Sequence, residues 1–299
     1  MSHQTAFSHR ANRTLHTVTL QADADRSHAI PVTARPPDRD TRWWRLLRPE
    51  VFVRVIYRST AVTIVLACAV VAYTTRRFTP LEAQRLGRRV AVRILRIARV
   101  TVEQQGKADP EPGLTVCNHR SYIDILALMC ATPCTFLCKK EVGRWPLIGT
   151  IAKSLGVVFV DRRSSQSRQE SLARVARAVL SGRRVTAFPE GTTTRGPGMG
   201  KPRPGLFRAA EQHDFPILPV VIEYADPNDA WVGDDTLLRH VLFWLAKPSG
   251  HVTVRFGKAL RRLDDPEGSL QERTESWMRS ALSQLNLDPD ERVWLQPMR

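Results

Sequence analysis

A histidine and an aspartate five positions apart are the strongest candidates for chemistry in this chain. They are His119 and Asp124 of the segment NHRSYID. Residues five apart in a regular helix diverge by about 140° at 100° per residue, so the pair meets only if His119 precedes a helix and Asp124 lies in its first turn. A histidine whose second ring nitrogen is held by a carboxylate has a fixed tautomer and suits a general base.

Two structural alternatives explain the same residues without catalysis. Ser121 and Asp124 form the S-x-x-D pattern of a capping box, in which the carboxylate binds backbone N–H groups at a helix start. His119 is also compatible with an ordinary loop histidine. The spacing alone leaves these alternatives open.

A second candidate is the hydroxyl-rich turn FPEGTTTRG, residues 188–196. Backbone N–H groups of a glycine-bearing turn, hydroxyl donors and the guanidinium of Arg195 suit a cluster of anionic oxygens. The KPRPG segment that follows adds Lys201 and Arg203 before a helix start, which also favours anions. An ordinary Gly/Pro loop is the alternative.

The elements that must position these residues alternate between strands and helices from about residue 106. β-branched runs predict strands over 113–119, 156–161, 184–191, 217–224 and 251–257. Amphipathic or apolar patterns predict helices over 121–131, 166–180, 205–213, 237–246 and about 268–286. This alternation predicts an α/β fold with a mostly parallel central sheet flanked by helices. We assign 106–299 to this catalytic domain.

An apolar segment and a basic helix precede the domain. Residues 59–75 carry no charge and extend over roughly 26 Å as a helix, slightly less than a hydrocarbon core. Residues 81–100 place Arg85, Arg89, Arg93 and Arg96 on one stripe and Leu86, Val90, Ile94 and Ile97 on another. Such a helix indicates a membrane surface, although a soluble helix that packs its apolar face on a core has the same pattern. We expect basic membrane-anchoring helices over 41–105, either re-entrant or as a single span.

Composition narrows the classes of function. The net charge is +16, and residues 42–100 hold thirteen arginines against two glutamates. A local basic surface attracts anionic lipid or nucleic acid, but no base-reading motif is visible, so we expect no nucleic-acid partner. Residues 1–40 lack the apolar region of a secretory signal, and we expect a disordered tail there.

The five cysteines do not indicate a disulfide framework or a metal site. Cys130, Cys134 and Cys138 follow an even C-x3-C-x3-C spacing, unlike the uneven spacing of iron–sulfur runs. Small buried apolar side chains are the better interpretation. We expect no metal and no cofactor.

Four segments together resemble a known family. NHRSYID, GVVFVDR, FPEGT and ILPVVIE occur in this order within about 105 residues. They are similar to the four sequence blocks of the 1-acylglycerol-3-phosphate acyltransferase family of glycerolipid and lysophospholipid acyltransferases. The resemblance extends over roughly 106–260.

The resemblance implies roles for residues in each block. His119 corresponds to the family's base and Asp124 to its supporting carboxylate. Arg162 matches a phosphate-contacting arginine, and Pro219 a position tied to the acyl donor. The residues that match the acceptor-binding turn are Glu190, Gly191 and Thr192. Lys139 matches a basic position near the acyl channel.

One position departs from the family pattern. Many lysophosphatidate enzymes read E-G-T-R-S, whereas this chain has Thr193 at the arginine position and an arginine only at Arg195. Related E-G-T-T variants resemble enzymes that use larger lysophospholipids or a lyso-ornithine lipid. The resemblance therefore implies the reaction class and leaves the acceptor open.

The expected activity is the transfer of a fatty acyl group from acyl-CoA or acyl carrier protein to the free hydroxyl of lysophosphatidate or a related lysophospholipid. A lyso-ornithine lipid O-acyltransferase is the alternative within the class. A catalytically inactive lipid-binding membrane protein is the alternative outside it. We expect membrane lipids as partners and a location at the cytoplasmic face of the inner membrane.

Overall fold

The computed structural model describes residues 48–262 and 268–285. These residues belong to one compact unit. The expected tail over 1–40 lies outside the described residues.

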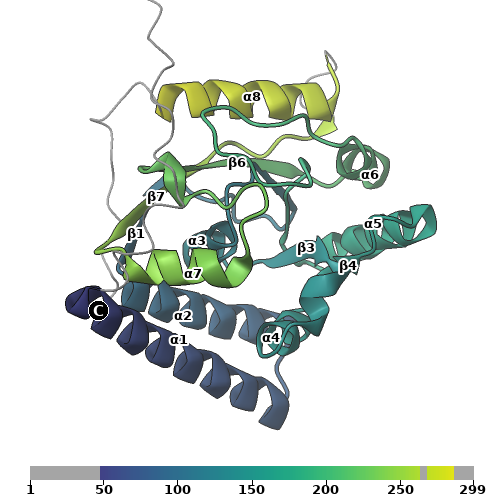
Figure 1. Ribbon diagram of the computed structural model, residues 1–299. Coiled ribbons are helices and arrows are strands. Elements are labelled where there is room, and N and C mark those ends of the chain that lie inside the picture. The colour runs from purple at the N-terminus through teal and green to yellow at the C-terminus, as the bar shows by residue number, and fades with distance from the viewer. Residues whose placement is uncertain (1–47, 263–267, 286–299) are drawn as a thin grey trace, which may run out of the picture. The chain divides into compact units, whose positions relative to one another are not determined.

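A seven-stranded sheet forms the centre of the fold (Figure 1). Its strands are β1 (Val100–Gln105), β2 (Leu114–Cys117), β3 (Thr135–Lys139), β4 (Val158–Val160), β5 (Val185–Ala187), β6 (Ile217–Tyr224) and β7 (Gly250–Phe256). Their order is β1-β7-β6-β2-β5-β3-β4, and every neighbouring pair is parallel except β6 with β7. The prediction of a mostly parallel sheet is confirmed.

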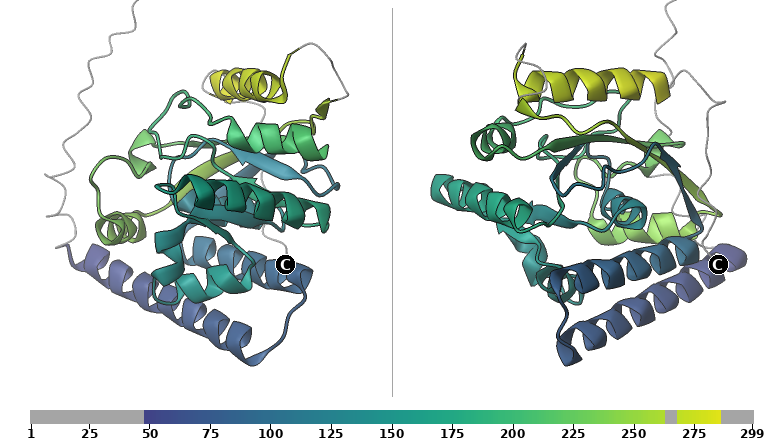
Figure 2. Two further views of the ribbon diagram at one scale, coloured as in Figure 1. Left: turned by 90° about the vertical axis from the view of Figure 1, so that its right-hand side faces the viewer. Right: turned by 180° about the vertical axis from the view of Figure 1, so that it is seen from behind.

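Helices cover both faces of this sheet. They are α1 (Pro49–Thr75), α2 (Pro80–Ala98), α3 (Ile123–Ala131), α4 (Ile148–Ser154), α5 (Ser165–Leu180), α6 (Gly205–His213), α7 (Leu237–Ala246) and α8 (Leu270–Leu285), with 3-10 turns η2 (Lys140–Arg144) and η3 (Pro227–Asp229). Residues of α5, α6 and α8 share one apolar core with the sheet, and residues of α1, α2, α3 and α7 share the other. Figure 2 shows the two helical layers from two further sides.

The alternation of side chains along β6 explains how the two cores form. Ile217 and Val221 point into the core beneath α5, α6 and α8, whereas Leu218, Val220 and Ile222 point into the other. A strand buried on both faces reads as a continuous apolar run, which is why this one was predictable. Since β2, β5 and β6 are parallel neighbours, the loops that follow their carboxyl ends meet at one edge of the sheet.

Helix α1 is longer than predicted. It has 27 residues and so a length of about 40 Å, instead of the 17 residues over 59–75. Arg54 and Arg58, which precede the uncharged residues 59–75, lie inside this helix. They donate to backbone carbonyls at the C-terminal end of α7, where helical carbonyls lack intrahelical partners. By length and composition α1 is apolar enough to cross a membrane, and 11% of its most apolar window is buried in the protein.

The apolar stripe of helix α2 packs on the protein itself. Its Leu86, Val90 and Ile94 lie against the core that includes α3. The arginine stripe of the same helix is exposed. Most of the large exposed apolar residues belong to α1, among them Val53, Ile64 and Val71, whereas α2 has one such residue, Leu81.

The expected domain boundary at residue 105 does not match the sheet. β1 lies before this boundary but pairs with β7 along its whole length. The sheet therefore begins at Val100, directly after α2, and the segment 41–105 contributes its first strand. Neither β1 nor β3 was predicted: β1 follows directly after α2 and ends in the polar residues Glu-Gln-Gln, and β3 reads TFLCK, without a β-branched run.

Candidate active site

The sheet edge fixes where the NHRSYID segment leaves β2. Asn118 is fully buried, and its side chain both donates to the carbonyl of Ile222 at 2.9 Å and accepts from its N–H at 2.8 Å. These two side-chain hydrogen bonds extend the pairing of β2 with β6 by one residue beyond Cys117. His119 follows at a defined point beyond the strand, and α3 begins four residues later.

His119 and Asp124 meet as the spacing required. The Nδ1 of His119 lies 2.8 Å from Oδ2 of Asp124, which is fully buried in the first turn of α3. The same oxygen accepts the backbone N–H groups of Arg120 at 2.6 Å and Ser121 at 2.9 Å. The capping and catalytic interpretations of Asp124 are therefore compatible, because one carboxylate holds the turn and the imidazole together.

Tyr224, which sequence reasoning missed, completes the set of donors around Asp124. Its hydroxyl, at the carboxyl end of β6, donates to Oδ1 of Asp124 at 2.6 Å. Burial raises the pKa of Tyr224 well above its ordinary value, and the neighbouring Asp124 raises it further, so this group remains a donor. Nothing in the local sequence marks it, because the contact depends on β6 lying beside β2.

The ring of His119 is oriented for chemistry at its other nitrogen. A carboxylate oxygen surrounded by N–H donors assigns the proton to Nδ1 and leaves Nε2 as the acceptor. The ring stacks on Phe188 at a centroid distance of 3.9 Å, and its side chain is 20% exposed. The imidazole is thus fixed by a carboxylate on one edge and an aromatic face, while remaining accessible.

Glu190 connects the two loops at this edge. Its Oε1 accepts the N–H of His119 at 2.9 Å, and its Oε2 accepts the N–H of Gly200 at 2.5 Å. Thr194 adds a backbone hydrogen bond to the His119 carbonyl at 2.8 Å. The structure thus brings Glu190 to His119, with both of its carboxylate oxygens engaged by protein donors.

Arg120 is a second residue that the sequence did not single out. It is fully buried and donates to Oγ1 of Thr194 and the carbonyl of Gly198, both at 2.8 Å, and to Oε2 of Glu223 at 2.6 Å. Burial raises the pKa of Glu223, and the Arg120 charge opposes this effect. Arg120 therefore fixes the hydroxyl-rich turn over the sheet edge.

Two guanidinium groups converge on the glycine of this turn. Gly191 has φ of +75°, and a Cβ there would lie 3.1 Å from Cζ of Arg203. Arg162 donates to the Gly191 carbonyl through Nη1. Burial lowers the pKa of Arg162, and the positive charge of Arg203 lowers it further. Thr192 and Lys201 are exposed nearby in sequence, and Arg195 is half-buried.

Thr193, at the position that departs from the family pattern, turns into the protein. Its hydroxyl donates to the carbonyl of Trp231, whose own N–H donates to the Arg120 carbonyl at 2.8 Å. The position thus contributes a structural contact where an arginine would contribute charge.

Two of the expected residues do not join this cluster. Pro219 is buried in β6 opposite Val116, beside Trp277 of α8. Lys139 is exposed at the end of β3.

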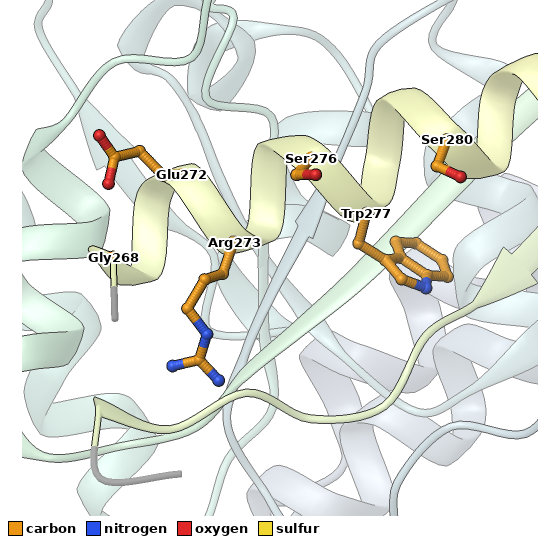
Figure 3. A pocket seen from close by; sticks show the side chains of 6 residues that line it. All are labelled: Gly268, Glu272, Arg273, Ser276, Trp277 and Ser280. Carbon is orange, nitrogen blue, oxygen red and sulfur yellow. The ribbon is translucent and has the colours of Figure 1, made fainter. Parts of the chain in front are cut away.

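A cavity of about 590 Å³ lies along α8 (Figure 3), and His119 does not line it. Its lining residues are Gly268, Glu272, Arg273, Ser276, Trp277 and Ser280, none of which is an expected site residue. Within residues 48–262 and 268–285, no three His, Cys, Asp or Glu side chains are grouped to hold a metal ion.

Comparisons with known proteins agree on one family. The family described as Acyltransferase matches residues 99–223. A lyso-ornithine lipid O-acyltransferase of Pseudomonas aeruginosa is 36% identical over 182 residues, which cover 59% of this chain and 70% of that protein. A 1-acyl-sn-glycerol-3-phosphate acyltransferase of Neisseria gonorrhoeae is 31% identical over 141 residues, which cover 44% and 55%.

A solved structure shares the fold. The crystal structure of the 1-acyl-sn-glycerophosphate (LPA) acyltransferase PlsC from Thermotoga maritima superposes with a TM-score of 0.64 at 16% identity, covering 83% of this chain and all of that one. The matched family region begins just before β1 and contains the His119 turn, the Gly191 turn and all of β6 except Tyr224. The chain is an acyltransferase and belongs to the 1-acylglycerol-3-phosphate acyltransferase family of glycerolipid and lysophospholipid acyltransferases.

Proposed function

We propose that the protein transfers a fatty acyl group from acyl-CoA or acyl carrier protein to the free hydroxyl of lysophosphatidate or a related lysophospholipid. The observation that carries this proposal is the 2.8 Å contact between His119 Nδ1 and Asp124 Oδ2, which directs Nε2 outward. A neutral imidazole in this setting accepts the proton of an alcohol.

In the proposed reaction, His119 first accepts a proton and later donates it. The acceptor hydroxyl gives its proton to Nε2 of His119 as its oxygen attacks the thioester carbonyl. Asp124 stabilises the resulting imidazolium. The tetrahedral intermediate collapses, the C–S bond breaks, and the imidazolium returns the proton to the departing thiolate. The proposal includes no acyl-enzyme, metal or cofactor, because a thioester is already activated.

The arginines at the Gly191 turn favour an acceptor that carries phosphate. Arg162 is held against the turn, and the Arg203 guanidinium lies against the same glycine. Paired guanidinium groups recognise phosphate oxygens through charge-assisted hydrogen bonds. We assign Arg162 and Arg203 to the acceptor headgroup, with Thr192, Arg195 and Lys201 at its exposed side.

A lyso-ornithine lipid is the second candidate acceptor. The Thr193 hydroxyl is engaged by the Trp231 carbonyl, so this position adds no cation to the site. The Pseudomonas aeruginosa relative is described as acting on a lyso-ornithine lipid. An amino-acid headgroup with one carboxylate needs less positive charge around it than a phosphate monoester. The uncharged Thr193, at a position where many lysophosphatidate enzymes have an arginine, is consistent with such a headgroup.

We further propose that α1 places the site at the cytoplasmic face of the inner membrane. Its exposed apolar residues, including Ile64 at 56% and Val71 at 59%, suit contact with acyl chains. Soluble thioester donors then approach from the aqueous side, while the lipid acceptor arrives by diffusion within the bilayer.

Acyl transfer by purified full-length protein in mixed micelles tests the reaction. Wild type and His119→Ala are assayed with acyl-CoA and acyl carrier protein donors against lysophosphatidate, lysophosphatidylethanolamine and lyso-ornithine lipid. We expect His119→Ala to lose about 100- to 10,000-fold in turnover with an unchanged melting temperature. Transfer that survives this substitution, or no transfer by folded wild type to any acceptor, contradicts the proposal.

Arg162→Gln distinguishes the two acceptors, with Arg208→Gln on the exposed face of α6 as the matched loss of charge. If the acceptor is a phosphate monoester, Arg162→Gln raises its KM by about tenfold or more and Arg208→Gln does not. If wild type prefers lyso-ornithine lipid over every lysophospholipid, the second candidate replaces the first.

A further inference from the structure

A basic cavity lies where the start of α1 meets the end of α2. Its volume is about 470 Å³, and it is lined by Arg54, Tyr57, Arg58, Arg96, Ile97 and Arg99. Four of these six residues are arginines, and none of the six is acidic. Figures 1 and 2 show the two helices side by side as an antiparallel pair.

The fold holds part of this charge in place. Arg58 is only 4% exposed and donates to the carbonyls of Leu245, Lys247 and Pro248 at the end of α7, the first at 3.0 Å. Arg58 also lies close enough to Arg54 and Arg99 to feel their charges. Carbonyl dipoles at a helix C-terminus offset such charge only in part, so an anion that enters the cavity meets pre-arranged guanidinium groups.

Exposed apolar side chains flank the cavity on α1. Phe52, Val53, Ile56 and Tyr57 are 50–68% exposed, and Tyr57 itself lines the cavity. A small soluble anion would make no contacts with these apolar side chains. A lipid would contact both surfaces, because its headgroup requires charged partners and its acyl chains require apolar ones.

We propose that this cavity binds the phosphodiester headgroup of an anionic phospholipid of the bilayer, at a site separate from the acceptor site. Binding of this lipid rests on the membrane association proposed above and is independent of which acceptor the enzyme uses. The strand register places the start of β1 at the same edge of the sheet as the carboxyl end of β6. Three strand spacings, roughly 14 Å, separate β1 from β2 across the sheet. A lipid held here keeps the His119 edge turned toward the membrane.

Vesicle flotation of the full chain at physiological salt tests the proposal. Vesicles of phosphatidylcholine alone are compared with vesicles that contain phosphatidylglycerol. Arg96→Gln with Arg99→Gln removes two charges from the cavity. As the matched control, Arg85→Gln with Arg89→Gln removes two exposed charges of α2 that do not line the cavity.

We expect wild type to prefer phosphatidylglycerol vesicles, and the cavity variant to lose at least about tenfold more affinity than its matched control. Equal losses of affinity in both variants would show that the overall positive charge of the protein attracts the vesicles, and would overturn the proposal. Equal binding of wild type to both kinds of vesicle would also overturn it. Acyl transfer in mixed micelles is measured in parallel and should be retained by the cavity variant, so failure of this site is distinguishable from failure of the enzyme.

Inorganic phosphate separates a lipid headgroup from a soluble anion. At low millimolar concentration and constant ionic strength, it should leave vesicle binding of wild type unchanged, because it offers no apolar contact. Phosphate that displaces wild type from the vesicles, and raises its melting temperature but not that of the cavity variant, assigns the cavity to a soluble anion and refutes the lipid occupant.

Discussion

Replacing Asp124 with asparagine separates the charge of this residue from its geometry. Its Oδ2 accepts three N–H donors, from His119 Nδ1, Arg120 and Ser121, while Oδ1 accepts the Tyr224 hydroxyl. An asparagine in this place must turn its oxygen toward the three N–H groups, because its NH2 would oppose donors there. The hydroxyl of Tyr224 can rotate to accept from that NH2. We therefore expect Asp124→Asn to keep the proton of His119 on Nδ1.

The expected loss of activity then reflects charge alone. A hydrogen bond to a charged group contributes about 1.5–3 kcal/mol. If the imidazolium is formed in the transition state, loss of the carboxylate charge lowers turnover by about 10- to 150-fold, since about 1.4 kcal/mol corresponds to a factor of ten. Asp124→Ala differs, because it leaves two backbone N–H groups and a buried hydroxyl without their acceptor, at about 1–3 kcal/mol each in the free energy of unfolding.

The assay pairs turnover with the 15N chemical shifts of the His119 ring. Asp124→Asn should show an Nδ1-protonated neutral ring, a near-native melting temperature and reduced turnover, whereas Asp124→Ala should lose stability as well. A His119 ring protonated on Nε2 in Asp124→Asn, or wild-type turnover of this variant, would refute a role for the Asp124 charge.

Three further outcomes follow, two from hydrogen bonds at the site and one from a buried cysteine. Tyr224→Phe removes a hydrogen bond to the charged Asp124 and should lower the free energy of unfolding by about 1.5–3 kcal/mol, measured by urea denaturation; an unchanged midpoint would show that this bond contributes nothing. Arg120→Met leaves the mostly buried Glu223 without its cation and should destabilise the protein by about 3–5 kcal/mol, more than Arg120→Met combined with Glu223→Leu; equal losses would contradict the pairing. Burial raises the pKa of the Cys134 thiol to about 12, so its thiolate fraction at pH 8 is about one in ten thousand. Iodoacetamide should modify Cys134 only after denaturation, and mass spectrometry of the folded protein checks this.

The contact between His119 and Asp124 was predictable because it is local. Both residues lie on one strand–turn–helix unit, so their spacing and the apolar patterns on either side were enough to predict that they meet. The helices over 205–213 and 237–246 and the strand over 217–224 were predicted with the bounds they have in the structure. Their continuous apolar or amphipathic patterns and clear end signals explain this agreement.

The tertiary structure alone decided which distant residues join that unit. Tyr224 reaches Asp124 across 100 positions, and Glu190 reaches the His119 backbone across 71, because β6 and β5 both lie beside β2. The order of strands in a sheet depends on how all helices cover its faces, and no local pattern encodes it. The same reason applies to α1. Its uncharged stretch predicted an apolar helix, but only the position of α7 explains why the helix also includes Arg54 and Arg58. Their partners are carbonyls 192 and 187 residues away.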